Sequence, residues 1–157
     1  MRLNFLCRHH RRSLLASPRD ARSVWQDYYP RITKSPCTPT PYQVNLAGTA
    51  LEAATIYLLA EPVCAGEDLE CFTETALLLI GMLEQLGESG LATTVVSGAG
   101  DMLQQFALRG ANTSVALAQS RKLHSLCDPV AAGGDARADS ATDSRVLAAG
   151  RTSVRVH

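Results

Sequence analysis

The sequence predicts an all-α protein: a helical hairpin or a small three-helix bundle with a disordered N-terminal arm and a disordered C-terminal tail. Three observations support this class. Apolar residues recur at alternating spacings of three and four through the middle of the chain, which is the period of one helix face. Prolines crowd the segment before it, and the segment from 128 onward has no aromatic residue. We therefore divide the chain into an arm over 1–41, a helical domain over 42–126 and a tail over 127–157.

The basic, proline-rich arm is expected to be a mostly disordered linker. Each proline removes a backbone donor and restricts the residue before it; the five are Pro18, Pro30, Pro36, Pro39 and Pro41. The arm also holds the single tryptophan, Trp25, and Tyr28 close to it. Aromatic side chains in a polar arm need a surface to lie against. We expect both to dock on the protein's own helices, with an external partner or nucleic-acid bases as the alternative.

The first predicted helix covers residues 44–60. Its apolar residues fall on one face: Val44, Ala47, Leu51, Ala54 and Leu58. Glu61 precedes Pro62, and the residue before a proline is pushed out of the α region, so the helix is expected to end there.

The second predicted helix, residues 67–87, carries the strongest pattern. A stripe of apolar residues follows heptad spacing along one face: Leu69, Phe72, Ala76, Leu79, Leu83 and Leu86. Carboxylates crowd its first turns, where the helix macrodipole favours them, and Gly87 and Gly90 are candidate stops. Apolar residues also lie off the stripe, so this helix is expected either to be central in a bundle or to pair with another chain.

A third helix is expected over residues 101–123, with a break allowed at Arg109 and Gly110. The preceding segment, 91–100, fits either a strand or a helix. Its Thr-Thr-Val-Val run favours β structure, while its apolar residues also keep helical spacing.

The formal net charge of zero hides segregated blocks. Residues 1–40 hold 8 basic and 2 acidic side chains, residues 41–90 hold 8 acidic and no basic ones, and residues 91–157 hold 7 basic and 5 acidic ones. The first two blocks are expected to attract each other. The candidate basic contacts are Arg8, Arg11, Arg12 and Arg19. Nucleic-acid contact through the arm, residues 1–34, is one alternative function, which the neighbouring acidic block disfavours.

We expect a cytoplasmic protein with reduced cysteines. No apolar run reaches the ~18–20 residues that span a bilayer, and the 5 cysteines are widely spaced with no C-x-x-C pair. The mitochondrial matrix is the alternative location. Residues 1–20 are arginine-rich, have no acid before Asp20 and are partly amphipathic, as a presequence is.

No cofactor or metal site is expected, and the chain is predicted not to be an enzyme. The alternative is a small enzyme or nucleotide binder that uses the loop Gly98–Gly100, because Gly-x-Gly after a β-favouring segment can begin a phosphate loop. Leu103 stands where the dinucleotide fingerprint needs glycine or alanine. His124 and Cys127 lie close enough in sequence to be a second candidate for chemistry.

The two apolar helices also give the chain a resemblance to a known group. The residues that carry it are Tyr42-Gln43-Val44, Gly48, Ala50-Leu51-Glu52, Ala54, Leu58-Leu59, Leu69, Leu79 and Leu83. With them, residues 42–88 resemble small bacterial two-helix proteins classed only as domains of unknown function. The resemblance implies a helical hairpin and no chemistry. The leading hypothesis is therefore a non-enzymatic interaction or regulatory module that binds a protein partner or a second copy through helix 67–87.

Overall fold

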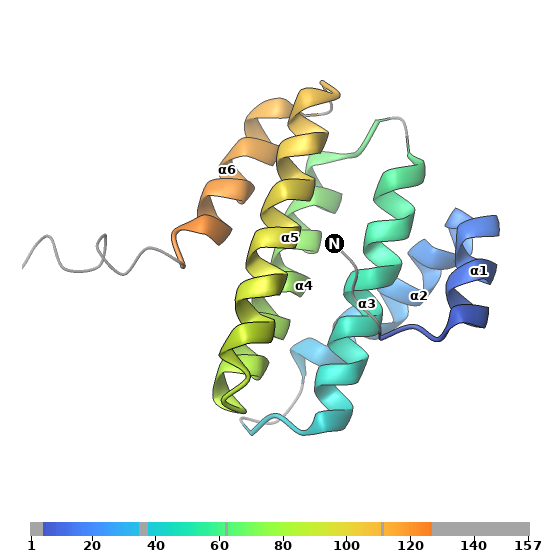
Figure 1. Ribbon diagram of the computed structural model, residues 1–157. Coiled ribbons are helices and arrows are strands. Elements are labelled where there is room, and N and C mark those ends of the chain that lie inside the picture. Colours follow the sequence, from blue (N-terminus) through green and yellow to red (C-terminus); the bar gives the residue numbers. More distant parts are fainter. Residues whose placement is uncertain (1–4, 35–37, 62, 111, 127–157) are drawn as a thin grey trace, which may run out of the picture.

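The computed structural model describes residues 5–34, 38–61, 63–110 and 112–126, which form six helices and no strand (Figure 1). The helices are α1 (Arg8–Ala16), α2 (Pro18–Thr33), α3 (Pro41–Ala60), α4 (Gly66–Gln85), α5 (Ser89–Leu108) and α6 (Thr113–His124). The all-α prediction is confirmed. The three-helix bundle is wrong, because twice that number of helices pack together. The predicted tail over 127–157 lies outside the described residues.

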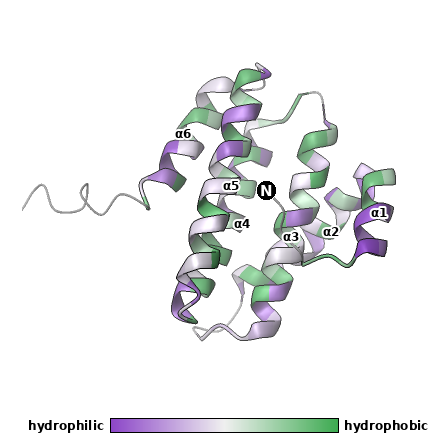
Figure 2. Cartoon of the chain, viewed as in Figure 1, coloured by the Kyte–Doolittle hydropathy of each residue, from purple (hydrophilic) through white to green (hydrophobic). Residues whose placement is uncertain are grey.

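The helices pack in the order in which they follow one another along the chain. The long helices α3, α4 and α5 lie side by side, with α6 against α5 and α4 on one flank (Figure 1). On the other flank α2 packs on α3 and touches α4, and α1 packs on α2 and α3. Figure 2 shows the hydrophobic residues on α3, α4 and α5 and a strongly hydrophilic first part of α1.

The N-terminal arm forms helices α1 and α2, which corrects the prediction of a mostly disordered linker. Pro18 and Pro41 occupy places that a helix tolerates. Pro18 is the first residue of α2, where its missing N–H would have no partner inside the helix. Pro30 lies inside α2 near its end, where its missing N–H leaves one helix hydrogen bond unformed. Pro41 opens α3 in the same way, behind a capping box in which Thr40 and Gln43 hydrogen-bond each other's backbone N–H groups.

Burial of apolar side chains stabilises the helices of the arm despite its proline content. Leu14 of α1 and Ala21, Trp25 and Ile32 of α2 are all buried. The expectation that Trp25 docks on the protein's own helices is confirmed, and Tyr28 packs partly buried against the same core. A buried tryptophan removes a large apolar area from water, which offsets much of the cost of ordering the arm.

The boundaries of α4 confirm one predicted stop and correct another. Gly87 has a φ of 79°, and the Glu88 N–H donates to the Leu83 carbonyl at 2.8 Å, which is the bond pattern of a Schellman cap. Gly90 is not a stop; it is the second residue of α5. The expected break after Arg109 is confirmed, with Gly110 at a φ of 81°.

The ambiguous segment 91–100 is helical, because α5 begins at Ser89. Its inward positions follow the helical period: Ala92, Val95, Val96 and Ala99 are buried. Tertiary packing therefore outweighs the β propensity of the Thr-Thr-Val-Val run. Among the described residues, no helix is both long enough and apolar enough to cross a membrane.

Candidate functional site

The predicted interaction stripe on helix 67–87 lies in the core of the bundle. Its first five members, Leu69 to Leu83, are at most 2% exposed, while Leu86, just beyond α4, is 41% exposed. The chain's own helices α3, α5 and α6 pack against α4. Of the two expectations for this helix, the central place in a bundle is confirmed, and Leu69 to Leu83 are covered by the chain's own helices.

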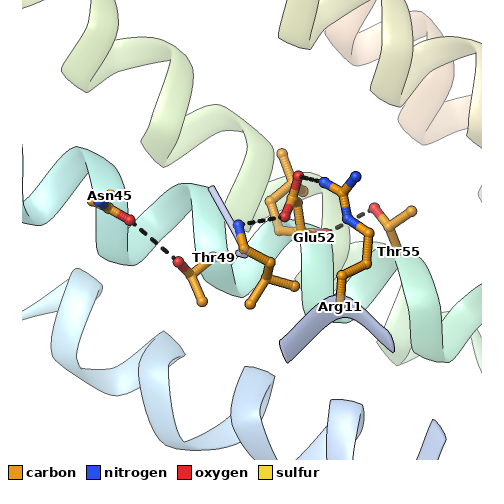
Figure 3. Close-up of polar contacts among 7 residues, drawn as sticks. Arg11, Asn45, Thr49, Glu52 and Thr55 are labelled. Atoms are coloured by element: carbon orange, nitrogen blue, oxygen red, sulfur yellow. Dashed lines mark hydrogen bonds and ion pairs between the residues drawn. The ribbon is translucent and has the colours of Figure 1, made fainter. Parts of the chain in front are cut away.

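The most specific polar site is a buried carboxylate on α3. Glu52 is 5% exposed, and both of its partners come from the N-terminal segment. The backbone N–H of Leu6 donates to its Oε2 at 2.7 Å, and the Arg11 guanidinium donates to its Oε1. Figure 3 shows Arg11 reaching from α1 across to Glu52. The same view shows Thr55 and Thr49 bonded within α3, so Glu52 is where this stretch of the helix is joined to another segment.

A close contact of an aromatic ring fixes the same segment one turn earlier on α3. A Cβ added at Gly48 would lie 2.2 Å from the Phe5 ring, so the ring rests directly on the bare helix backbone. No other residue type leaves that space open. Gly48 and Glu52 are four residues apart and therefore lie on one face of α3. Together they form a binding surface for residues 5–11. We call this contact, between residues 5–11 and the face of Gly48 and Glu52, the N-terminal latch.

Aromatic and polar contacts around Trp25 join α2 to α3 and α4, and we call this interface the Trp25 seam. The Trp25 indole Nε1 donates to Thr75 Oγ1 at 3.1 Å, and its ring lies 6.3 Å from that of Tyr57. Arg22 sits 5.1 Å above the Tyr57 ring and 3.5 Å from the Asp68 carboxylate. Burial, followed by the charge of Asp68, raises the pKa of Tyr57. The expected attraction between basic arm and acidic block is realised here and at Glu52.

The far end of α2 is tied to α4 by a hydrogen bond from a tyrosine to a carboxylate. The Tyr29 hydroxyl donates to Glu74 Oε2. This bond, with burial and the Glu74 charge adding to it, raises the pKa of Tyr29 to about 12. The anionic tyrosinate would face a carboxylate at close range, so the neutral form is favoured.

The four predicted basic contacts divide into one structural residue and three surface residues. Arg11 is held in the ion pair with Glu52. Arg8 and Arg12 on α1 and Arg19 on α2 are exposed, and the ion pairs among the described residues do not include them. His9 and His10 are exposed beside them, and α1 has no acidic residue in its first turn. We call Arg8, His9 and Arg12 the basic face of α1.

The structure corrects the alternative based on a Gly98–Gly100 loop, because these residues lie inside α5. Gly100 serves the packing of two helices. A Cβ there would lie 2.6 Å from His124 Nε2, and the Ser120 hydroxyl donates to the Gly100 carbonyl at 3.3 Å. His124 therefore fills the space above Gly100, while Cys127 lies outside the described residues. No strand and no turn are present in the described structure to form a phosphate loop at this place.

The described cysteines are free thiols that differ in environment. Cys64 is buried, with Sγ 3.5 Å from the Leu58 carbonyl, and burial raises its pKa. Burial also raises the pKa of Cys71, with the Glu74 charge next. Cys7 is exposed and caps α1, with its Sγ 3.3 Å from His10 Nδ1. In the described part of the chain, no three His, Cys, Asp or Glu side chains gather as metal ligands would.

Sequence reasoning missed the binding surface formed by Gly48 and Glu52. Both residues were noted only as part of a resemblance. A signal was present: Glu52 is the one charged residue of α3, within a run of alanine, leucine and threonine. A lone carboxylate in such a helix is a candidate for a buried pair, although the sequence does not say which arginine pairs with it.

Comparisons with known proteins identify no relative of this chain: no family model, no curated protein and no solved structure matches it.

Proposed function

We propose that this chain is a non-catalytic helical binding module that docks a partner with an acidic surface through the basic face of α1. The observation that carries the proposal is the placement of Arg8, His9 and Arg12 at the first turns of a helix. Arg8, in the first turn, lies beside the positive end of the macrodipole, which costs the helix about 0.3–1 kcal/mol. A feature that opposes its own local structure points to a role outside that structure.

The rest of the arm supports this role because it acts as a rigid mount. The N-terminal latch and the Trp25 seam fix α1 and α2 to the bundle. A fixed helix presents its charges in one arrangement and loses little conformational entropy when a partner binds. The groups that could otherwise take part in chemistry are used within the fold: Glu52 pairs with Arg11, and His124 covers Gly100.

Binding of a labelled polyglutamate peptide, measured by fluorescence anisotropy, tests the proposal. We expect saturable binding at low salt that weakens as salt screens the charges. Replacing Arg8 and Arg12 with glutamine should abolish it. The matched control replaces Arg121 and Lys122, exposed at the end of α6, with glutamine and should leave it unchanged.

A parallel titration with a short DNA duplex separates the nucleic-acid alternative. If the duplex binds more tightly than polyglutamate, and its affinity depends on Arg8 and Arg12, the basic face is a phosphate contact and the proposed acidic protein partner is wrong. If neither probe binds, or if the α6 control loses as much affinity as the α1 variant, the proposal fails.

A further inference from the structure

The outward side of α4 carries a graded surface that α2 meets at Glu74, where the Tyr29 hydroxyl donates to the carboxylate. Glu67, Glu70 and Glu74 are exposed along its first turns. Leu77 and Leu78 follow them, half-buried. One helix face therefore changes from acidic to apolar along its length, and it is the face opposite to the buried stripe.

The outward side of α1 changes in the same direction along the helix, from charged to apolar, but its charges are basic. Arg8 and Arg12 are exposed in its first half, and Leu15, in its second half, is 60% exposed. The steps between these residues are four and three. The same steps separate two glutamates and a leucine on α4, so both helices present their charged and apolar groups at the same intervals.

These two faces cannot meet within one molecule. Among the described residues, α1 contacts α2 and α3 but not α4, and α3 lies between them (Figure 1). Neither face is therefore used by the other within one molecule.

We propose that α1 of one copy docks in parallel along α4 of a second copy. The pairs would be Arg8 with Glu70, Arg12 with Glu74 and Leu15 with Leu77. The inference rests on the proposed function of the basic face and names its acidic partner as this chain itself. If each copy gives its α1 and receives its partner's α1, the contact occurs twice and closes a symmetric dimer.

The charge distribution of the chain favours a second copy over an unrelated acidic protein. The formal net charge is zero, so two copies do not repel each other at long range, and nearly neutral proteins associate readily. Arginines opposite glutamates fix the register of the two helices, and the leucines behind them supply apolar contact.

Light scattering coupled to size exclusion tests this at about 0.01 M and about 1 M salt. We expect twice the chain mass at low salt and a shift toward the single chain mass at high salt. One variant carries Arg8→Glu with Arg12→Glu, and a second carries Glu70→Arg with Glu74→Arg. Each variant alone should be monomeric at low salt, because its α1 and α4 faces then carry the same sign. The four positions are exposed, so circular dichroism should show unchanged helicity.

An equimolar mixture of the two variants is the decisive sample. Every α1–α4 contact between unlike variants regains opposite charges, so the mixture should return to twice the chain mass. A control variant with Arg121→Glu and Lys122→Glu carries the same type of charge reversal on α6 and should remain dimeric. A wild-type chain that is monomeric at low salt, or a mixture that stays monomeric, overturns the inference.

Polyglutamate distinguishes the failure of this inference from the failure of the proposed function. If the chain is monomeric yet binds the peptide through Arg8 and Arg12, the basic face serves another acidic partner and only the self-association is wrong. If the chain dimerises through these faces, the peptide should compete and return it to the monomer mass. A chain that neither dimerises nor binds the peptide contradicts both.

Discussion

Glu52 shows how a single buried carboxylate fixes a whole segment. Its two partners, the Leu6 N–H and the Arg11 guanidinium, both belong to residues 5–11. Desolvation of a carboxylate is costly unless hydrogen bonds and an opposite charge compensate it. The position of the N-terminal segment is therefore coupled to the burial of Glu52, and each depends on the other.

Replacing Glu52 with alanine should lower the free energy of unfolding by about 2–3 kcal/mol, because a charge-assisted pair and a backbone acceptor are lost together. Glu52→Gln should cost less, about 1–2 kcal/mol, since the amide oxygen still accepts from the Leu6 N–H. Urea denaturation measures both. Glu84→Ala, at an exposed position of α4, is the control and should stay within about 0.5 kcal/mol of the wild type. Equal effects at both sites would contradict the paired role of Glu52.

Two glycines in helix interiors are predicted to respond oppositely to the same substitution. Gly48→Ala places a methyl group inside the Phe5 ring position and should destabilise the fold by about 1–3 kcal/mol. Gly81→Ala in α4 meets nothing within 4 Å, so it should stabilise by about 0.5–1 kcal/mol through helix propensity. Thermal unfolding of the two variants measures the contrast. Combining Gly48→Ala with Phe5→Ala should remove most of the clash, and a full additive loss would mean that Phe5 does not rest on Gly48.

At the scale of elements, α2 is the helix of the arm that contacts both α3 and α4, the two helices of the acidic block. It packs on α3 and reaches α4 through Trp25 and Tyr29. Trp25 is buried and Tyr29 partly buried, and the polar tip of each hydrogen-bonds a residue of α4. The seam therefore depends on apolar burial for its strength and on hydrogen bonds for its register.

The joint between α2 and α4 should respond to alkaline pH. The pKa of Tyr29 is raised from 10.0 to about 12, first by the hydrogen bond to Glu74 and then by burial. A folded-state pKa above the unfolded one stabilises the fold below the unfolded pKa, and this contribution is lost as the pH rises from about 10 to about 12. The stability difference between wild type and Tyr29→Phe should thus be largest below about pH 10 and shrink toward about pH 12.

Denaturation midpoints across that pH range measure the Tyr29 effect. Glu74→Gln keeps a hydrogen-bond acceptor but removes the negative charge. The pH range over which the difference between wild type and Tyr29→Phe is lost should therefore narrow. A difference between wild type and Tyr29→Phe that stays constant with pH would show that the hydroxyl does not form this bond.

At the scale of the whole molecule, the attachment of the arm is mainly apolar. Within the part of the chain that the structure describes, Arg11–Glu52 and Arg22–Asp68 join the arm to the acidic block, and the arginine of each is partly exposed. The more exposed Arg22–Asp68 pair contributes little and is screened by salt, whereas burial of the Glu52 carboxylate makes its pair with Arg11 less sensitive to salt. The buried apolar side chains of α1 and α2 belong to the same hydrophobic core as those of α3: Leu14, Ala21, Trp25 and Ile32.

Raising the salt to about 1 M should therefore lower the stability by no more than about 1–2 kcal/mol and leave the arm in place. Trp25, the one tryptophan of the chain and 3% exposed, reports this directly through the wavelength of its fluorescence. We expect no change in its emission maximum with salt and a red shift only on unfolding. A red shift at high salt, with helicity unchanged, would mean that the arm is held by charge.

Repeating apolar spacing was enough to locate the main helices. The predicted 44–60 and 67–87 correspond to α3 at Pro41–Ala60 and α4 at Gly66–Gln85, because each helix buries a face with the period of its own backbone. The predicted third helix was found as α6 and part of α5, with its break in the expected place. The prediction of a disordered arm is wrong because proline breaks a helix only beyond its first turn, and Pro18 and Pro41 occupy first-turn positions.

The sequence by itself determined the helical class, the positions of the central helices, and the opposite charges of the arm and of residues 41–90. These follow from local spacing and composition. Only the tertiary structure decided which faces are free. The spacing of the α4 stripe predicts a docking surface, yet α3, α5 and α6 cover it. The predicted linker instead contains α1, a helix that carries the exposed Arg8 and Arg12. The pairing of Arg11 with Glu52 and the contact of Phe5 with Gly48 join residues more than 40 positions apart. Burial and pairing of that kind depend on which segments meet in space, and helical periodicity carries no information about it.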